Sequence, residues 1–146
     1  MAVTPYRGKF HIEWYPVTVS TAFTVNDMVE ILSTAAGVGT LAKCTATSTA
    51  IYGLIQKKIA STDADYATAR KVPVLVGDAD AEFLFDVSTG TAAATDVGEM
   101  IDLDDENSVD VDAYTLGQVK ITDVISTTKI VGKINKGFGK EIPVTV

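Results

Sequence analysis

The sequence is poor in the side chains from which many enzyme and metal sites are built. Its 146 residues include one cysteine, Cys44, and one histidine, His11. A zinc site needs three or four protein ligands, mostly nitrogen or sulfur, which two residues cannot supply. A lone histidine in a strand-like segment is more often a surface residue than a general base, and a lone cysteine is usually a small buried side chain. We therefore expect no histidine-based catalysis, no protein zinc site and no internal disulfide.

Longer functional signatures are missing too. No run of 18 apolar residues occurs, which predicts no membrane span, and the first residues lack the apolar region of a secretory signal. Neither G-x-x-x-x-G-K-[ST] nor G-x-G-x-x-G is present, and the GFG at 137–139 lacks the strand–loop–helix setting of a phosphate loop. No two carboxylates stand out as a glycosidase pair. We expect a protein that is not an enzyme and has no cofactor.

Basic residues are outnumbered by acidic ones. There are 19 acidic and 12 basic side chains, for a formal net charge of −7. Seven of the acids and none of the bases fall within residues 97–113, so the rest of the chain is neutral. Nucleic-acid binding depends on Lys and Arg side chains that displace the counterions of phosphates. The charge balance therefore argues against a nucleic-acid partner.

The densest acidic stretch is IDLDDENSVDVDA, residues 101–113. As a calcium loop beginning at Asp102, it would carry Asn107 in place of the turn glycine and Ala113 in place of the closing glutamate. Apolar and acidic residues alternate on both sides of DENS, which has the composition of a turn. We therefore expect two strand ends with apolar side chains inward and carboxylates outward. An irregular calcium site stays open, as does a charged interface for a basic partner at Asp102, Asp104, Asp105 and Glu106.

The sequence is rich in β-branched residues arranged in short runs. Strand-like runs recur at a spacing of about ten residues, separated by Gly, Asp, Ser and Thr. They lie at 50–59, 71–77, 82–87, 99–104, 114–126 and 128–135. This spacing is typical of an all-β barrel or sandwich, and the length fits one domain. We predict a mainly β fold: a small antiparallel barrel in a single domain, with one short helix or helical turn and extended terminal arms.

Three segments fit this pattern less well. In 24–37, TVNDMVEILSTAAG, the apolar residues follow helical spacing, although a short strand at MVEIL fits equally. Residues 63–71, DADYATARK, are the best remaining candidate for a helix or turn. Residues 88–98 are small and polar, and we expect them to form a mobile loop.

The first 23 residues hold five of the eleven aromatic side chains. Phe10, Ile12 and Trp14 alternate with polar residues, as in a half-buried strand, and Pro16 then interrupts the ladder. Residues 1–20 therefore form either an edge strand or an aromatic arm that docks on a neighbour. As an arm, the segment would use as anchors Tyr6, Phe10, Trp14 and Tyr15. The main domain would span 21–136, followed by a C-terminal tail at 137–146.

Four short motifs follow one another in the rest of the chain: Gly53 in a strand-like IYG, the VPV at 72–74, the DVG at 96–98 and the VGKIN at 131–135. In this order they resemble the β-tulip head-decoration proteins of tailed bacteriophages. The resemblance covers residues 24–135. It favours a strand over a helix within 24–37.

The resemblance implies a virion structural protein, made in the host cytoplasm, that decorates the capsid exterior. It would stabilise the capsid by binding neighbouring subunits of the major capsid protein. The resemblance also implies a homo-oligomer, with a trimer favoured. The alternatives are another virion or extracellular β module (a fibre, adhesin or minor head subunit), a lipocalin-like ligand barrel, and an enzyme with a carboxylate pair in a cleft.

Overall fold

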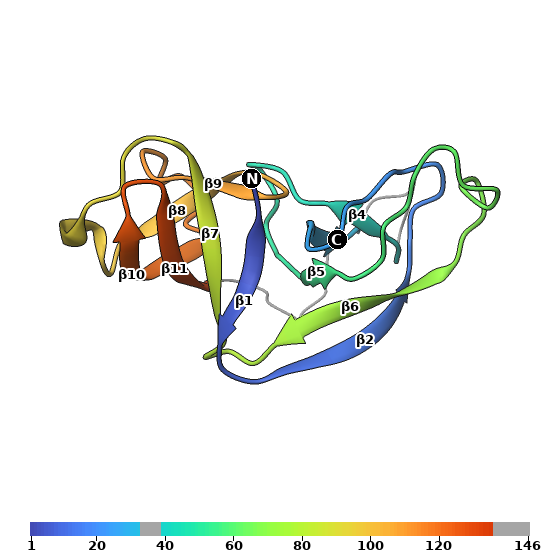
Figure 1. Ribbon diagram of the computed structural model, residues 1–146, viewed down its shortest axis with the longest axis horizontal. Helices are drawn as coiled ribbons and strands as arrows, with labels where there is room; N and C mark the ends of the chain where they lie inside the picture. Colours follow the sequence, from blue (N-terminus) through green and yellow to red (C-terminus); the bar gives the residue numbers. More distant parts are fainter. Residues whose placement is uncertain (33–38, 136–146) are drawn as a thin grey trace.

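The computed structural model describes residues 1–32 and 39–135. Within these residues, eleven strands and one short 3-10 helix form two β-sheets that lie side by side (Figure 1). The first, called the barrel sheet, has the strand order β1 (Val3–Arg7), β7 (Glu82–Thr89), β11 (Lys129–Ile134), β10 (Val119–Ser126), β8 (Met100–Asp105) and β9 (Ser108–Asp110). The second sheet has the order β2 (Phe10–Pro16), β6 (Lys71–Gly77), β5 (Gly53–Ile55), β3 (Met28–Ile31) and β4 (Leu41–Lys43). No helix of the described residues is long and apolar enough to cross a membrane.

Five strands of the barrel sheet close into a ring. Antiparallel pairs run from β7 through β11, β10 and β8 to β9, and β9 returns to β7 in parallel. Alternate side chains of β7 point into the ring, where Phe83, Phe85 and Val87 are buried. β1 pairs with the first half of β7 at Val3–Phe85 and Pro5–Phe83. The ring is therefore a closed barrel, with β1 as an added strand beside β7.

The second sheet also curls upon itself. Its two end strands approach through one parallel bridge between Val17 and Leu41, and the Thr18 N–H donates to the Leu41 carbonyl at 3.1 Å. One face of this sheet encloses its own core, which includes Val29, Ile31, Leu41, Ile55, Val72, Val74 and Val76. The opposite face contributes Met28 and Leu54 to the core of the barrel. Because the two sheets share buried side chains, they form one domain.

The N-terminal hairpin spans both sheets. β1 ends the barrel sheet and β2 ends the second sheet (Figure 1). Gly8 lies in the short connection between the two strands. Its φ of +111° favours glycine, and a Cβ there would lie 2.8 Å from the Cα of Ala81. β2 pairs with β6 from Phe10–Gly77 to Pro16–Lys71. Residues 1–20 therefore supply an edge strand to each sheet.

The predicted fold class is confirmed: the chain is mainly β and forms a single small domain, in which the described residues include a closed five-stranded barrel and one 3-10 turn. Within the contested segment 24–37, residues 28–31 form β3, so the helical alternative is wrong there. Residues 33–37 of that segment and the tail at 137–146 lie outside the described residues.

Of the two alternatives for residues 63–71, the turn is confirmed, because residues 63–68 consist of turns and bends. The 3-10 helix (Ala94–Asp96) falls instead in the segment expected to be a mobile loop. Several hydrogen bonds hold that segment in place, including the following two. The Ala93 N–H donates to the Asp96 carboxylate at 2.8 Å, and the Gly98 N–H donates to the Ile121 carbonyl at 2.8 Å.

Candidate functional site

The edge strand β2 presents apolar side chains to solvent. Ile12 is 47% exposed and Trp14 is 60% exposed. Directly across from them on β6 lie the half-buried Leu75 and Pro73. We call these four residues the β2 strip. Neighbouring apolar side chains exposed together mark binding surfaces more often than isolated ones do.

The alternation of Phe10, Ile12 and Trp14 predicted a half-buried strand, and the strand is present, but Ile12 and Trp14 on its apolar face are exposed. The other face of β2 packs inward, where the Tyr15 and Tyr52 rings lie with centroids 5.5 Å apart. The physical reason is the position of β2, which leaves the barrel behind after its first residues (Figure 1). Phe10, at the start of the strand, still reaches the barrel core and packs edge-on against Phe83 at 5.5 Å.

The structure divides the four predicted anchor residues into two kinds. Trp14 and Tyr6 are exposed, Tyr6 by 46%, and the Arg7 guanidinium lies 5.3 Å from the centre of the Tyr6 ring. Phe10 and Tyr15 are half-buried and pack on the protein's own aromatic rings. The four therefore do not form one patch. Ile12 lies beside Trp14 but was not among the predicted anchors. Residues two apart on a strand share a face, and this spacing could have identified Ile12 as a neighbour of Trp14.

Hydrogen bonds hold the inward carboxylate of β2. The Tyr52 hydroxyl donates to one oxygen of Glu13, and His11 Nε2 lies 2.7 Å from the other. These bonds, first that from Tyr52, lower the pKa of Glu13. Burial, followed by the nearby Glu13 carboxylate, raises the pKa of the Tyr52 hydroxyl, so Tyr52 keeps the proton that it donates. The exposed His11 is thus a surface partner of Glu13, as expected for a surface histidine.

The acidic stretch 101–113 forms the predicted hairpin. β8 and β9 pair at Leu103–Val109, with Glu106 and Asn107 in the turn. The apolar residues point inward and are at most 3% exposed: Ile101, Leu103, Val109 and Val111. The inward half of the prediction is therefore confirmed.

Asp102 departs from the prediction that the carboxylates face outward. It is 6% exposed, and its two oxygens accept the backbone N–H groups of Thr115 at 3.0 Å, Leu116 at 2.8 Å and Gly117 at 2.7 Å. The loop before β10 folds over this carboxylate, and that contact is distant in sequence. Asp102 therefore anchors a loop and is removed from the predicted charged interface.

The other three acids of that interface remain accessible to different degrees. Asp104 is exposed and accepts the Ser88 hydroxyl at 2.6 Å. The half-buried Asp105 closes the hairpin turn by accepting the Asn107 N–H at 2.9 Å. Glu106 lies 4.0 Å from the Lys43 ammonium. These side chains satisfy local hydrogen bonds and an ion pair, and Asp104 is the most outward of them.

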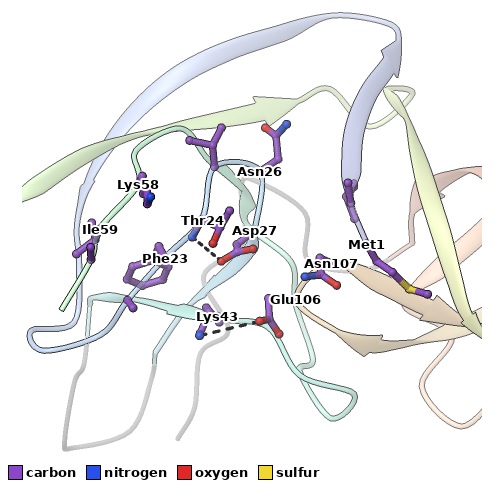
Figure 2. Close-up of a pocket in the computed structure, with 15 residues that line it drawn as sticks. Met1, Phe23, Thr24, Asn26, Asp27, Lys43, Lys58, Ile59, Glu106 and Asn107 are labelled. Carbon is purple, nitrogen blue, oxygen red and sulfur yellow. Dashed lines mark hydrogen bonds and ion pairs between the residues drawn. The ribbon is translucent and has the colours of Figure 1, made fainter. Parts of the chain in front are cut away.

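A pocket of about 350 Å³ lies where the hairpin turn of the barrel meets the second sheet (Figure 2). The Met28 N–H donates to the Glu106 carbonyl at 2.8 Å and joins the two parts. The pocket is lined by the N-terminal residues 1–3, the segments 22–27 and 58–60, and by Lys43, Glu106 and Asn107. Sequence reasoning missed this pocket because its walls come from segments far apart in the chain.

The buried acid of the pocket, Asp27, has a structural explanation. It is 5% exposed, and burial, reinforced by the charge of Glu106, raises its pKa. Its carboxylate accepts the Thr24 N–H at 2.8 Å while its own N–H donates to the Thr24 carbonyl at 3.0 Å (Figure 2). Asp63 and Asp96 close turns in the same reciprocal way. Asp27 is therefore a turn-closing residue.

Cys44 is 1% exposed, as expected for a small buried residue, and burial raises the pKa of its thiol well above the ordinary value. In the part of the chain that the structure describes, no three His, Cys, Asp or Glu side chains group in a way that could hold a metal ion.

Comparisons with models of protein families, with curated proteins and with solved structures each found no match. Function is therefore inferred from the order of the sequence motifs and from the geometry of the β2 strip.

Proposed function

We propose that the protein is a non-enzymatic structural component of a virion, which decorates the capsid exterior of a tailed bacteriophage. It would stabilise the capsid by binding neighbouring subunits of the major capsid protein. The observation that carries the proposal is the β2 strip, where Ile12 and Trp14 are exposed on a strand that has one neighbouring strand among the described residues. The order of sequence motifs that resembles head-decoration proteins supports it.

The strip is suited to binding because β2 is held in place by its pairing with β6 and by contacts on its inward face. Seven residue pairs join β2 to β6, and the inward Glu13 and Tyr15 both contact Tyr52. A preorganised surface loses little conformational entropy when it binds. Exposed tryptophan is also among the residues most often found at the energetic centre of interfaces. Trp14 is therefore the main anchor in this proposal, with Ile12 beside it.

The acidic hairpin supplies a second, weaker contact in this proposal. Asp104 is exposed and Glu106 is half-buried, so both can approach a basic patch on a capsid subunit. Exposed ion pairs contribute little free energy and are screened by salt. The hairpin would therefore steer and orient the protein, while the β2 strip supplies most of the affinity.

The test is co-sedimentation of the purified protein with expanded, empty heads of its phage. We expect the wild type to sediment with the heads, and Trp14→Ala to weaken binding by at least about tenfold. Point variants test the strip more specifically than deletion of residues 1–15, because the deletion would also remove β1 and most of the β2–β6 pairing. Ile12→Ser and Ile125→Ser form a matched pair, since Ile125 is 50% exposed on β10.

Only the variants in the strip should reduce binding. Wild-type protein that fails to bind heads at any salt concentration would contradict capsid decoration. It would favour another virion or extracellular β module. Binding that Trp14→Ala and Ile125→Ser leave equally unchanged would contradict the role of the strip.

A further inference from the structure

Within residues 1–32 and 39–135, β2 pairs with β6 along one edge only, and the direction of the backbone groups at its other, open edge can be determined. At one end of the strand, the Lys9 carbonyl accepts the Asp78 N–H at 3.0 Å, and at the other the Val17 N–H donates to the Arg70 carbonyl at 3.0 Å. Since the N–H and C=O of one residue point the same way and successive residues alternate, the odd-numbered residues of β2 face β6. The even-numbered Phe10, Ile12 and Trp14 therefore direct their backbone groups to the open edge.

The other edge strand of the hairpin is blocked at the equivalent place. The Asp86 N–H donates to the Ala2 carbonyl at 3.1 Å, so the even-numbered residues of β1 face β7. Val3 and Pro5 then face the open edge of β1, and proline has no N–H. Proteins commonly protect sheet edges in this way. β2 keeps its outward donors from Phe10 to Trp14 and reaches a proline only at Pro16.

We propose that this edge of β2 binds the same edge of a second copy of the chain, antiparallel and related by a two-fold axis through Ile12. In this register Ile12 lies opposite Ile12 of the second copy, and Phe10 lies opposite Trp14. Three outward residues on each copy then form about six backbone hydrogen bonds, two for each directly bonded pair. The paired stretch ends before Pro16 and Gly8, neither of which can extend it.

Side-chain complementarity between His11 and Glu13 selects this register and a copy of the chain as the occupant. His11 and Glu13 flank Ile12. His11 of each copy therefore lies opposite Glu13 of the other copy, in addition to the 2.7 Å contact between the two residues within each chain. An axis through Glu13 would place two glutamates opposite each other and set Phe10 against Pro16, which lacks a donor. An axis through His11 would set Trp14 against Gly8, whose φ of +111° is not extended.

The pairing leaves the side chains of the β2 strip accessible. Strand addition uses backbone groups at the edge, whereas Ile12 and Trp14 project from the face of the sheet. Two copies would join their strips into one apolar surface across the axis. The inference is independent of the capsid partner, and its order of two differs from the trimer that the sequence resemblance implies.

Sedimentation velocity of the purified protein over a wide concentration range tests the pairing. We expect the wild type to approach twice the 15.4 kDa mass of one chain. Ile12→Pro removes the central N–H at the open edge but no hydrogen bond to β6. It should raise the dissociation constant of the dimer at least a hundredfold. Ile12→Thr keeps that N–H and should stay within about tenfold of the wild type. Far-UV circular dichroism checks that both variants keep the β fold.

A cysteine pair tests the register and remains decisive if Ile12→Pro fails to fold. Directly opposed, hydrogen-bonded residues have Cα atoms about 5.5 Å apart, within the range of a disulfide. Ile12→Cys should therefore cross-link two chains on mild oxidation. Trp14→Cys should not, because the two positions would be about 13 Å apart along the strands.

A wild type that is monomeric at every concentration, or a trimer that Ile12→Pro leaves intact, would overturn the inference. So would equal cross-linking at positions 12 and 14. Failure to bind heads with the dimer intact would contradict the proposed function alone.

Discussion

β1 and β2 are consecutive strands of one hairpin, and each ends a sheet, yet their exposed edges differ. β1 buries Val3, places Pro5 at its open edge and joins its last residue, Arg7, to Glu82 at 2.5 Å. β2 exposes Ile12 and Trp14 and retains its outward N–H groups up to Pro16. The position of a strand at a sheet edge therefore does not decide its role. The side chains and donors at that edge do, and they distinguish a protected edge from one that keeps its donors and apolar side chains accessible.

The largest effect should come from placing the same charge on each strand. Val3→Asp would bury a carboxylate without a partner, and we expect it to lower the free energy of unfolding by about 3 kcal/mol or more. Trp14→Asp would place the carboxylate in solvent and should change that free energy by less than about 1 kcal/mol. Urea denaturation followed by far-UV circular dichroism measures both values. Equal losses would mean that the two strands are equally buried, contrary to the comparison.

A smaller loss of stability should follow from removing the hydrogen bond on the inward face of β2. Tyr52→Phe removes the hydroxyl that donates to Glu13 and should cost about 1–2 kcal/mol of stability, because Tyr52 is 7% exposed. Tyr114→Phe is the matched control, since Tyr114 is 55% exposed and should change little. The same denaturation experiment applies. Equal midpoints for the two variants would show that the contact between Tyr52 and Glu13 does not hold β2.

The strands were largely predictable, because alternation of side chains and turn residues are local properties of the chain. All six predicted runs from residue 50 onward overlap a strand, and 71–77 coincides with β6. The parallel closure of β7 with β9 and the division into two sheets depend on pairings far apart in sequence, which no local pattern records.

The candidate site was less predictable for the same reason. The alternation at Phe10, Ile12 and Trp14 predicted a strand, but which face is buried depends on how far the barrel extends beneath it. Asp102 belonged to an alternating pattern that predicted exposure, and a loop at 115–117 covers it instead. In both cases the local pattern predicted the element, and a contact distant in sequence decided the environment of the side chain.

Acid should weaken the inner contacts of both strands, through different chemistry. Hydrogen bonds from Arg7 and then Thr122 lower the pKa of Glu82 below its ordinary 4.5, and those from Tyr52 and His11 lower that of Glu13. A carboxyl whose pKa is lower in the folded state stabilises the fold above the ordinary pKa. That contribution is lost as the pH falls through the folded pKa. Glu82→Gln and Glu13→Gln should therefore each flatten the loss of stability below about pH 4.5.

Salt separates the two contacts in the same titration. The partner of Glu82 is an arginine whose side chain is largely exposed, so part of the Glu82 contribution should disappear in concentrated salt. The main partner of Glu13 is the neutral hydroxyl of Tyr52, and its contribution should persist. Stability curves from pH 7 to pH 3, at low and high salt, measure both. A slope that neither Gln variant changes would contradict the assignment.

The smallest effect on stability should come from removing the proline from the open edge of β1. Pro5→Thr restores an N–H there and should lower the free energy of unfolding by no more than about 1 kcal/mol, mainly through the freer unfolded chain. In an Ile12→Pro background, where the proposed pairing of β2 with a second copy is lost, the new donor on β1 should give weak association at high concentration. Thr4→Ala adds no donor at that edge and should leave this background monomeric. If Pro5→Thr also stays monomeric, the proline is not what blocks β1, and its short length and the irregular pairing between Pro5 and Arg7 would account for the difference from β2.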